Sequence, residues 1–241
     1  MQQDYLIAGL RVRMDTYGRA LTQAEAYRTE TVGEPDIEIV SNPEELQQRQ
    51  PHLSMDDCEY LSTGGSFYRQ LLRHEGMMLH ASAVVKDGYA YLFSAPCGTG
   101  KSTHTSLWRQ VFGEEQVIML NDDKPALRRE NGRWYAYGTP WSGKTAQNVN
   151  IRVPLGGVCM LTRGEVNEIE PFGGTRAAFA IMEQTARPYG GDGRMRLLEL
   201  LDQLLQEVPV WKLRCTPTED AVHVSHDAMS REAHKRWNQN Q

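Results

Sequence analysis

The sequence predicts an α/β protein built around a phosphate-binding loop and preceded by a small β-rich lobe. Two observations predict the α/β core. An apolar run at residues 89–93 leads into a glycine turn and then a helical segment, and a second apolar strand at residues 117–120 ends in acidic residues. Alternating apolar and polar residues near the N-terminus predict the lobe, which we expect to span residues 1–60, with the main domain at residues 61–241.

The N-terminal lobe has two stretches with the alternation of strands. Residues 4–14 alternate well enough for one or two short strands, and residues 36–40 form a cleaner one. Residues 42–50 are rich in Glu and Gln, which suits an exposed helix or a loop. The lobe carries no chemical motif, and His52 is expected at the surface.

The segment before the phosphate loop contains a histidine of interest. Residues 66–74 have helical apolar spacing, and Gly76 is expected to end that helix. Residues 77–85 are then predicted to form a strand that carries His80. A hydrogen-bonded core histidine is the common alternative, but its place before the loop favours an active-site role. There it would orient phosphate as a cation or bind a divalent metal as neutral imidazole.

A glycine-rich turn carries the strongest motif of the chain. It matches G-x-x-x-x-G-K-[ST] at every fixed position except the first, where Ala95 stands. In such loops, backbone N–H groups and the positive end of the following helix hold polyphosphate. The expected nucleotide-binding residues are Cys97, Gly98, Thr99, Gly100, Lys101, Ser102 and Thr103. A glycine-rich strand–turn–helix connection without a ligand is the alternative.

The second apolar strand ends in three polar residues. Residues 117–120 are predicted to form a buried parallel strand, and Asn121, Asp122 and Asp123 follow it. Carboxylates at the carboxyl end of a strand beside a phosphate loop suit a metal ion or an attacking hydroxyl. By itself, Asn-Asp-Asp is more typical of a solvated turn, and the neighbouring loop favours the functional interpretation.

Further strands and helices follow the acidic residues. We predict a hairpin at Asn131-Gly132, a rigid loop at 138–144, strands at 153–162 and 210–215, and helices at 177–186, 194–208, 218–222 and 228–237. The leucine-rich helix at 194–208 has the spacing of a core or dimer-facing helix. Lys144, Trp141 and Arg163 are candidates for a phosphate cation, a site wall and a transition-state cation, with structural or surface roles as alternatives.

The composition argues against several classes of partner. A net charge of −5 disfavours nucleic acid or an anionic membrane as the main partner. No secretion signal is visible, and no apolar run is long enough to cross a bilayer. The four cysteines are far apart and form no C-x-x-C pair, which indicates reduced thiols and predicts a cytoplasmic protein.

Three segments together resemble the HPr kinase/phosphorylase and phosphoenolpyruvate carboxykinase superfamily: the strand from His80, the loop at 97–103 and the acidic strand end. The resemblance spans residues 76–123 and is greatest to small HPr-kinase-like members, some of which belong to peptide-modification pathways. It implies the mixed sheet of that P-loop superfamily. By residue, it implies His80, Lys101, Asp122 and Asp123 as catalytic groups, with Ser102 and Asp122 holding the metal.

The resemblance also implies an activity that uses ATP and Mg²⁺. The expected reaction transfers the γ-phosphoryl group to a hydroxyl, with serine of a peptide or protein as the first candidate acceptor. We find no clear counterpart of the loop by which HPr kinases dock their protein substrate, so a small-molecule acceptor such as a free amino acid is the second hypothesis. A nucleotide-binding regulator without turnover, suggested by Ala95, is the third. Related kinases often assemble, which makes a homo-oligomer a further prediction.

Overall fold

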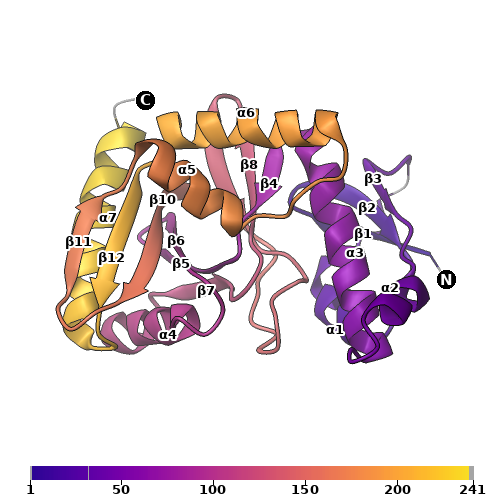
Figure 1. Cartoon of the computed structure of the whole chain (residues 1–241), viewed down its shortest axis with the longest axis horizontal. Helices are drawn as coiled ribbons and strands as arrows, with labels where there is room; N and C mark the ends of the chain where they lie inside the picture. The colour runs from indigo at the N-terminus through magenta and orange to yellow at the C-terminus, as the bar shows by residue number, and fades with distance from the viewer. Residues whose placement is uncertain (1, 32, 239–241) are drawn as a thin grey trace.

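A mixed α/β fold with two sheets is seen in the computed structural model, which describes residues 2–31 and 33–238 (Figure 1). The small sheet contains β1 (Gln3–Ile7), β2 (Leu10–Met14) and β3 (Ile37–Ile39). The large sheet contains β4 (Gly76–Met78), β5 (Ala81–Lys86), β6 (Tyr89–Ser94), β7 (Ile118–Asn121), β8 (Ala126–Glu130), β9 (Arg133–Tyr137), β10 (Arg152–Arg163), β11 (Glu168–Pro171) and β12 (Val210–Cys215). The helices are α1 (Gly18–Ala24), α2 (Pro43–Arg49), α3 (Met55–Leu71), α4 (Lys101–Phe112), α5 (Gly174–Glu183), α6 (Gly191–Glu207) and α7 (Glu219–Asn238), with short 3-10 turns η1 (Glu25–Tyr27) and η2 (Leu72–His74).

The long strand β10 joins the two halves of the large sheet. Its first residues pair antiparallel with β9, which continues the meander β4-β8-β9. Its later residues pair parallel with β6 on one side and with β12 on the other. Because one strand serves both halves, the sheet curls around β10, and β11 extends it beyond β12.

Functional segments gather at one edge of the large sheet because of its strand directions. β5 lies antiparallel between β6 and β7, so β6 and β7 run the same way. β10 and β12 also run parallel to β6. The carboxyl ends of these four strands therefore meet at one edge, which carries the glycine loop, the acidic residues and the start of β5.

Helices cover both faces of this sheet. Alternate residues of β6 point to opposite faces, as the period of a strand requires. Tyr91 and Phe93 pack with Trp108 of α4 and Met229 of α7. Leu92 lies on the other face with the leucines of α6 and with Ile181 of α5. The buried residues of the leucine-rich helix α6, which are Leu197, Leu200, Leu201 and Leu204, therefore belong to the core.

The small sheet packs against α3, beside the large sheet (Figure 1). Its apolar residues share a core with Phe67 and Tyr68 of α3 and with Trp141 from the loop after β9. Trp141 is 1% exposed, stacks on Phe67 with ring centroids 4.9 Å apart and donates a hydrogen bond to Thr63. Trp141 is thus a core residue. α3 spans residue 60, and the division of the chain at that residue remains a prediction.

One predicted strand is two strands in the structure. The stretch 77–85 divides into β4 and β5, which pair with β8 and β6 in different halves of the large sheet. The chain passes between these halves at Leu79 and His80. There the His80 amide donates to the Gln184 carbonyl after α5, at 2.7 Å, so His80 lies on a connection rather than within a strand.

The strand before the acidic residues is also corrected. β7 pairs antiparallel with β5 and ends the strand order, and Ile118 at its start is 44% exposed. The prediction of a buried parallel strand is therefore wrong in its pairing. Its direction relative to β6, which places the acidic residues beside the glycine loop, agrees with the structure.

Two helices are longer than predicted. α3 begins at Met55, capped by Ser54, whose side chain accepts from the Asp57 amide at 3.0 Å, and it passes through Gly64 and Gly65. The predicted helices 218–222 and 228–237 are one helix, α7. α7 continues through its polar middle because Ser225 is buried there, 3.1 Å from the ring of His104 on α4.

The remaining predictions of secondary structure are confirmed within a few residues. They include the two N-terminal strands, β3, β6, the strand β12 and the hairpin β8–β9, whose turn residues Asn131 and Gly132 have positive φ. Residues 42–50 contain the helix α2. α1 and β11 were not predicted. Within the described parts of the chain, none of the helices combines the length and apolar content that crossing a membrane requires.

Glu59 on α3 makes stability depend on pH. Its carboxyl is fully buried; Oε1 accepts from the Tyr17 amide at 3.2 Å, and Oε2 has no hydrogen-bond partner among the described residues. Burial raises the pKa of Glu59 from 4.5 to about 7. Between these values the folded chain holds a proton that the unfolded chain has released, so stability falls as pH rises through this window.

We expect Glu59→Gln to reduce this dependence, because an amide does not ionise. The Tm of Glu59→Gln minus the Tm of the parent should be larger at pH 8 than at pH 5. Glu44→Gln, at an exposed position on α2, is the control and should show the same difference at both values. Parallel Tm profiles of parent and Glu59→Gln would contradict this prediction.

Candidate active site

The glycine loop connects β6 to α4 in the predicted manner. Gly98 and Gly100 have φ of 76° and 118°, and a side chain at either position would meet no atom within 4 Å. These positions therefore need glycine for backbone angle and not for space. Ala95 does not have a positive φ, which explains why alanine is tolerated at the first position of the motif.

The loop leaves an exposed face at the start of α4. Cys97, Gly98, Ser102 and Thr103 are exposed, and Thr99 and Gly100 are half-buried. The first amides of α4 have no partner within the helix, as at any helix start. The loop and the helix start together suit an anion.

Lys101 is buried beneath this loop. It is 7% exposed, and its Nζ donates to the Ala95 carbonyl at 2.9 Å. Burial lowers the pKa of Lys101, while the carboxylates of Asp123 and Asp122 act in the opposite direction. The two carboxylates therefore favour the charged form of Lys101.

Asp122 is joined to α4 by a chain of hydrogen bonds. Its Oδ1 accepts from Ser82 Oγ at 2.7 Å, and Ser82 Oγ lies 2.7 Å from Thr105 Oγ1 on α4. Because Ser82 gives its single proton to the carboxylate, Thr105 is the donor to Ser82. Asp122, Ser82 and Thr105 are all buried, so this chain fixes the carboxylate relative to the helix that begins at Lys101.

Asp123 is paired with two basic side chains. Its Oδ1 lies 3.3 Å from His80 Nε2, and its Oδ2 is ion-paired with Lys124. Burial raises the pKa of Asp123, but the hydrogen bond from His80 and the Lys124 ammonium outweigh burial, so the pKa lies below its usual value. Gln184 Oε1 lies 3.1 Å from His80 Nδ1, which holds the ring in one orientation. Asp123 is therefore anionic at neutral pH.

Asn121 shapes the backbone that presents the two acids. Its Oδ1 accepts from the amides of Asp123 and Lys124 at 2.9 and 2.6 Å, and its Nδ2 donates to the Thr139 carbonyl at 2.9 Å. Such a side-chain turn is typical of asparagine. Asn121 is fully buried, so it has a structural part in the Asn-Asp-Asp motif.

A turn from the loop after β9 lies against both acids. Thr145 Oγ1 donates to Asp122 Oδ2 at 3.0 Å. Gly143 has φ of 74°, and a Cβ there would lie 3.1 Å from Asp123 Cβ. The Gly143 amide donates to Tyr60 on α3 and its carbonyl accepts from Gln23 on α1, at 2.7 and 3.0 Å. The N-terminal helices thus hold this turn over the acids.

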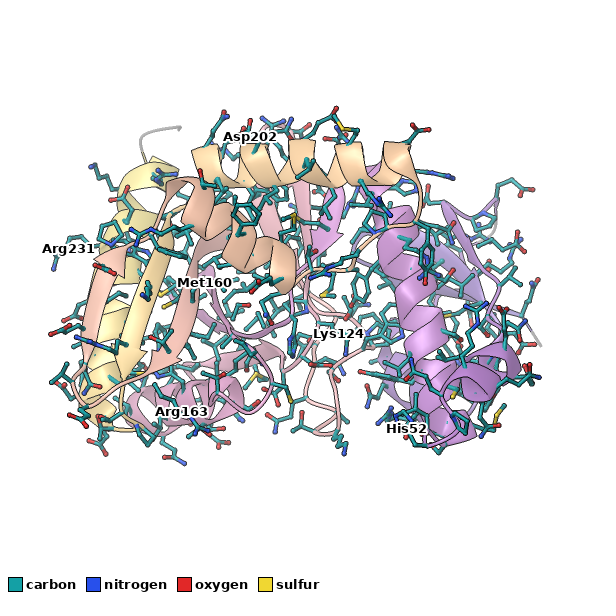
Figure 2. All side chains as sticks on the ribbon, viewed as in Figure 1. His52, Lys124, Met160, Arg163, Asp202 and Arg231 are labelled. Carbon is teal, nitrogen blue, oxygen red and sulfur yellow. The ribbon has the colours of Figure 1, made fainter. Side chains whose placement is uncertain are left out.

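Further basic side chains lie around the glycine loop and the acids. Lys144 is exposed on the turn. Arg163, at the end of β10, lies near α4 in Figure 2, and its Nη2 donates to the Gly98 carbonyl at 2.6 Å. Arg163 therefore contacts the glycine loop itself. Lys124 lies between α3 and the central sheet in the same view, 5.5 Å from the ring of Tyr60.

A cavity adjoins the loop at the ends of β10 and β12. It has a volume of about 360 Å³ and is lined by Thr99, Gly100, Leu161, Thr162, Arg163, Gly164, Cys215, Thr216 and Pro217. Its size is at the lower end of the range for small-molecule sites. Among the described residues, no group of three or more His, Cys, Asp or Glu side chains is arranged to hold a metal ion.

Several residues of this site were not predicted. Ser82 could have been predicted from the sequence. Residues two apart on an extended chain point to the same face, and Ser82 lies two residues after the candidate His80. Lys124 directly follows the acids in the sequence. Thr105, Thr145 and Gln184 carry no local sequence signal, because they reach the site through tertiary contacts.

The chain matches a protein family and is similar to solved structures. No curated protein sequence matches the chain significantly. Among solved structures, the HPr(Ser) kinase/phosphatase from Coxiella burnetii superposes with a TM-score of 0.38 at 12% identity, covering 68% of this chain and 94% of that chain. Those values are too low to carry an argument about a shared fold.

The family comparison is informative over most of the chain. Residues 55–219 match the family described as "SynChlorMet cassette protein ScmC". The matched segment begins with α3, contains the glycine loop, the acids and the turn over them, and ends at the start of α7. Because the match covers more than half of the residues, this chain belongs to the ScmC family.

Proposed function

We propose that this protein is an ATP-dependent kinase that transfers the γ-phosphoryl group to a hydroxyl. One observation carries the proposal: the hydrogen-bonded chain from Asp122 through Ser82 to Thr105, which joins the acids to the helix that starts at the glycine loop. A phosphate-binding loop and carboxylates held at a fixed separation are the parts that phosphoryl transfer requires, since catalysis there depends on positioning and charge.

The nucleotide would bind along the exposed face of the loop. Amides of residues 97–103 would receive the phosphates, and Lys101 would leave the Ala95 carbonyl for the β- and γ-phosphate oxygens. The cavity beside Thr99 and Thr216 would receive the nucleoside. Arg163 would stabilise the loop through its hydrogen bond to the Gly98 carbonyl.

Ser102 and Asp122 would hold the magnesium ion. Mg²⁺ prefers oxygen ligands and binds through one or two protein groups together with nucleotide phosphates, so a hydroxyl and a carboxylate suit it. Ser102 is exposed at the helix start, and both oxygens of Asp122 have hydroxyl partners instead of cations. The ion would neutralise charge on the phosphate oxygens.

Asp123 would receive and orient the acceptor hydroxyl. Its carboxylate is anionic and held in place by His80 and Lys124. The same two basic groups would face the transferring phosphoryl group and offset its charge. Serine of a peptide or protein is the acceptor that the resemblance to HPr-kinase-like proteins favours, and a small hydroxyl compound is the second candidate.

The proposal is tested by incubating the purified chain with Mg²⁺ and [γ-³²P]ATP. Parallel reactions contain serine peptides, proteins, free serine or other small hydroxyl compounds. Label on a peptide or protein supports the first acceptor class, and label on a small molecule supports the second. Binding of ATP with no ADP formed in any reaction would overturn the kinase assignment and identify a nucleotide-binding regulator.

Gly143→Ala should lower ADP production by more than its loss of folding stability explains. A Cβ at a φ of 74° costs about 1 kcal/mol of folding free energy. Here it also meets Asp123 at 3.1 Å and would displace that carboxylate. Gly88→Ala is the matched control, because Gly88 has φ of 82° and nothing within 4 Å of its Cβ position.

The two glycine variants are compared by Tm and by ADP production. Both should lose similar stability, and Gly143→Ala alone should lose turnover. Equal turnover in both variants would contradict the role of Asp123.

A further inference from the structure

We propose that Thr145 is a phosphorylation site for the chain's own kinase activity. The inference rests on the proposed function and extends it to a covalent modification of the turn over the acids. In this reaction Thr145 accepts the γ-phosphoryl group from the nucleotide bound to the same chain.

Thr145 presents a hydroxyl to the catalytic acids. Its Oγ1 donates to Asp122 Oδ2 at 3.0 Å and also lies 3.3 Å from the Ser142 carbonyl, so the hydroxyl lies beside the carboxylate that would hold the ion and the γ-phosphate. Ser82 also donates to Asp122, but it is fully buried and hydrogen-bonded to Thr105, so it cannot present its oxygen to a phosphate. Thr145 lies on an exposed turn.

The turn occupies the place that an external acceptor would need. Gly143 lies against Asp123, while Thr145 contacts Asp122, so residues 143–145 cover both carboxylates. Asp122 is 7% exposed and the Asp123 side chain is 20% exposed, so little of either carboxylate is open to a second molecule. Of the two hydroxyls that already lie at Asp122, the one on the exposed turn is that of Thr145.

The tip of the turn, residues 144–146, lies between two anchors. One anchor is Gly143, whose amide donates to Tyr60 and whose carbonyl accepts from Gln23. The other is formed by Gln147, whose carbonyl accepts from the Asp122 amide at 3.1 Å, and Asn148, whose side chain accepts from Tyr27 at 2.7 Å. Residues 144–146 are exposed. Ala146 has φ of 53°, which disfavours the present conformation for a residue other than glycine.

The transfer balances without any other reactant. The Oγ1–P bond forms as the bond between the γ-phosphorus and the β–γ bridging oxygen breaks, and ADP leaves with that oxygen. The hydroxyl proton passes to water, and Asp122 stays free to hold the ion. The product carries about two negative charges beside Asp122 and Asp123, so repulsion would drive the turn off the acids and open them to an external acceptor.

The sequence allows the modified residue to be identified directly. Trypsin cleaves after Lys144 and Arg152, and Thr145 is the sole hydroxyl residue in peptide 145–152. Ser142 falls in the preceding peptide, 134–144. The full chain is incubated with Mg²⁺ and [γ-³²P]ATP without an acceptor, digested and analysed by mass spectrometry. If the phosphate slows cleavage at Lys144, fragmentation of peptide 134–152 locates it.

Label on Thr145 is the expected result. Thr145→Val removes the hydroxyl at nearly constant size and should reduce incorporation to the level of a reaction without Mg²⁺, whereas Thr145→Ser should restore it. Thr31→Val, at an exposed threonine of the N-terminal lobe, should leave incorporation unchanged. The fraction labelled per minute should not depend on protein concentration, because donor and acceptor belong to one chain.

The outcomes separate this inference from the proposed function. ADP production or labelling of an added acceptor while Thr145 stays unmodified overturns the inference and leaves the kinase assignment intact. Labelling that rises with protein concentration, or that persists in Thr145→Val, also overturns it. Absence of both ADP production and labelling in every reaction overturns the kinase assignment and the inference together.

Discussion

Asp123→Asn is expected to lower phosphoryl transfer by about 10²–10⁴-fold, the usual contribution of a positioned acid or base. The amide keeps the shape of the side chain and loses the charge that holds His80 and Lys124 on either side. ATP affinity should stay nearly unchanged, because the glycine loop and Lys101 are untouched. ADP production and calorimetric titration with ATP measure the two quantities separately.

The control for this variant is Asp202→Asn on α6. Asp202 is exposed and accepts from Gln206 at 2.7 Å, on the helix that covers the sheet away from α4 (Figure 2). The Asp202→Asn variant should keep the turnover and the ATP affinity of the parent. A Tm measurement confirms that each variant is folded under the assay conditions. Full turnover in folded Asp123→Asn would remove Asp123 from the mechanism.

Lys101→Met is expected to weaken ATP binding by about ten- to a hundredfold, the worth of a hydrogen bond between charged groups. Methionine keeps the apolar length of the buried stem and removes the ammonium. Turnover should fall as well, because the γ-phosphate loses a cation that would neutralise its charge. Without nucleotide, the variant loses only the bonds from Nζ to the Ala95 and Pro96 carbonyls, at 2.9 and 3.5 Å, so its Tm should change little.

Lys235→Met on α7 serves as the matched lysine control. Lys235 is exposed on α7, the helix packed behind the sheet. Its removal changes the net charge by the same amount as Lys101→Met, so it corrects for any general charge effect on nucleotide affinity. An ATP affinity equal to that of the parent in Lys101→Met would show that the glycine loop is not the phosphate site.

The sequence was most informative where local chemistry fixes the structure. The glycine loop required positive φ at Gly98 and Gly100, and the following helix begins at Lys101 as predicted. The hairpin at Asn131-Gly132 was equally local. Local patterns failed where tertiary contacts decide the outcome. α3 passes through Gly64, where the absence of a side chain makes room for Trp141. A Cβ at this position would lie 2.8 Å from Trp141 Cδ1.

The strand errors have a topological cause. Residues 77–85 carry one continuous apolar pattern, yet the chain changes from one half of the sheet to the other at His80. No periodicity marks such a change, because both halves bury their strands. β7 is antiparallel to its neighbour because that neighbour is β5. The residues of β7 do not indicate which strand lies beside it.

The site could be predicted in part for similar reasons. Motif chemistry identified Lys101, Asp122, Asp123 and His80, and the structure places the last two 3.3 Å apart and joins Asp122 to the loop helix through Ser82. Their catalytic and metal-binding roles remain predictions. Thr145 is separated from Asp122 by more than twenty residues and reaches it through the fold alone.

A crystal structure of the chain with Mg²⁺ and a non-hydrolysable ATP analogue tests the central claim most directly. We predict triphosphate along residues 97–103, Lys101 on the β- and γ-phosphates, the ion between Ser102 and Asp122, and the γ-phosphate facing Asp123. A nucleotide bound elsewhere, or with its γ-phosphate directed away from Asp122 and Asp123, would contradict it.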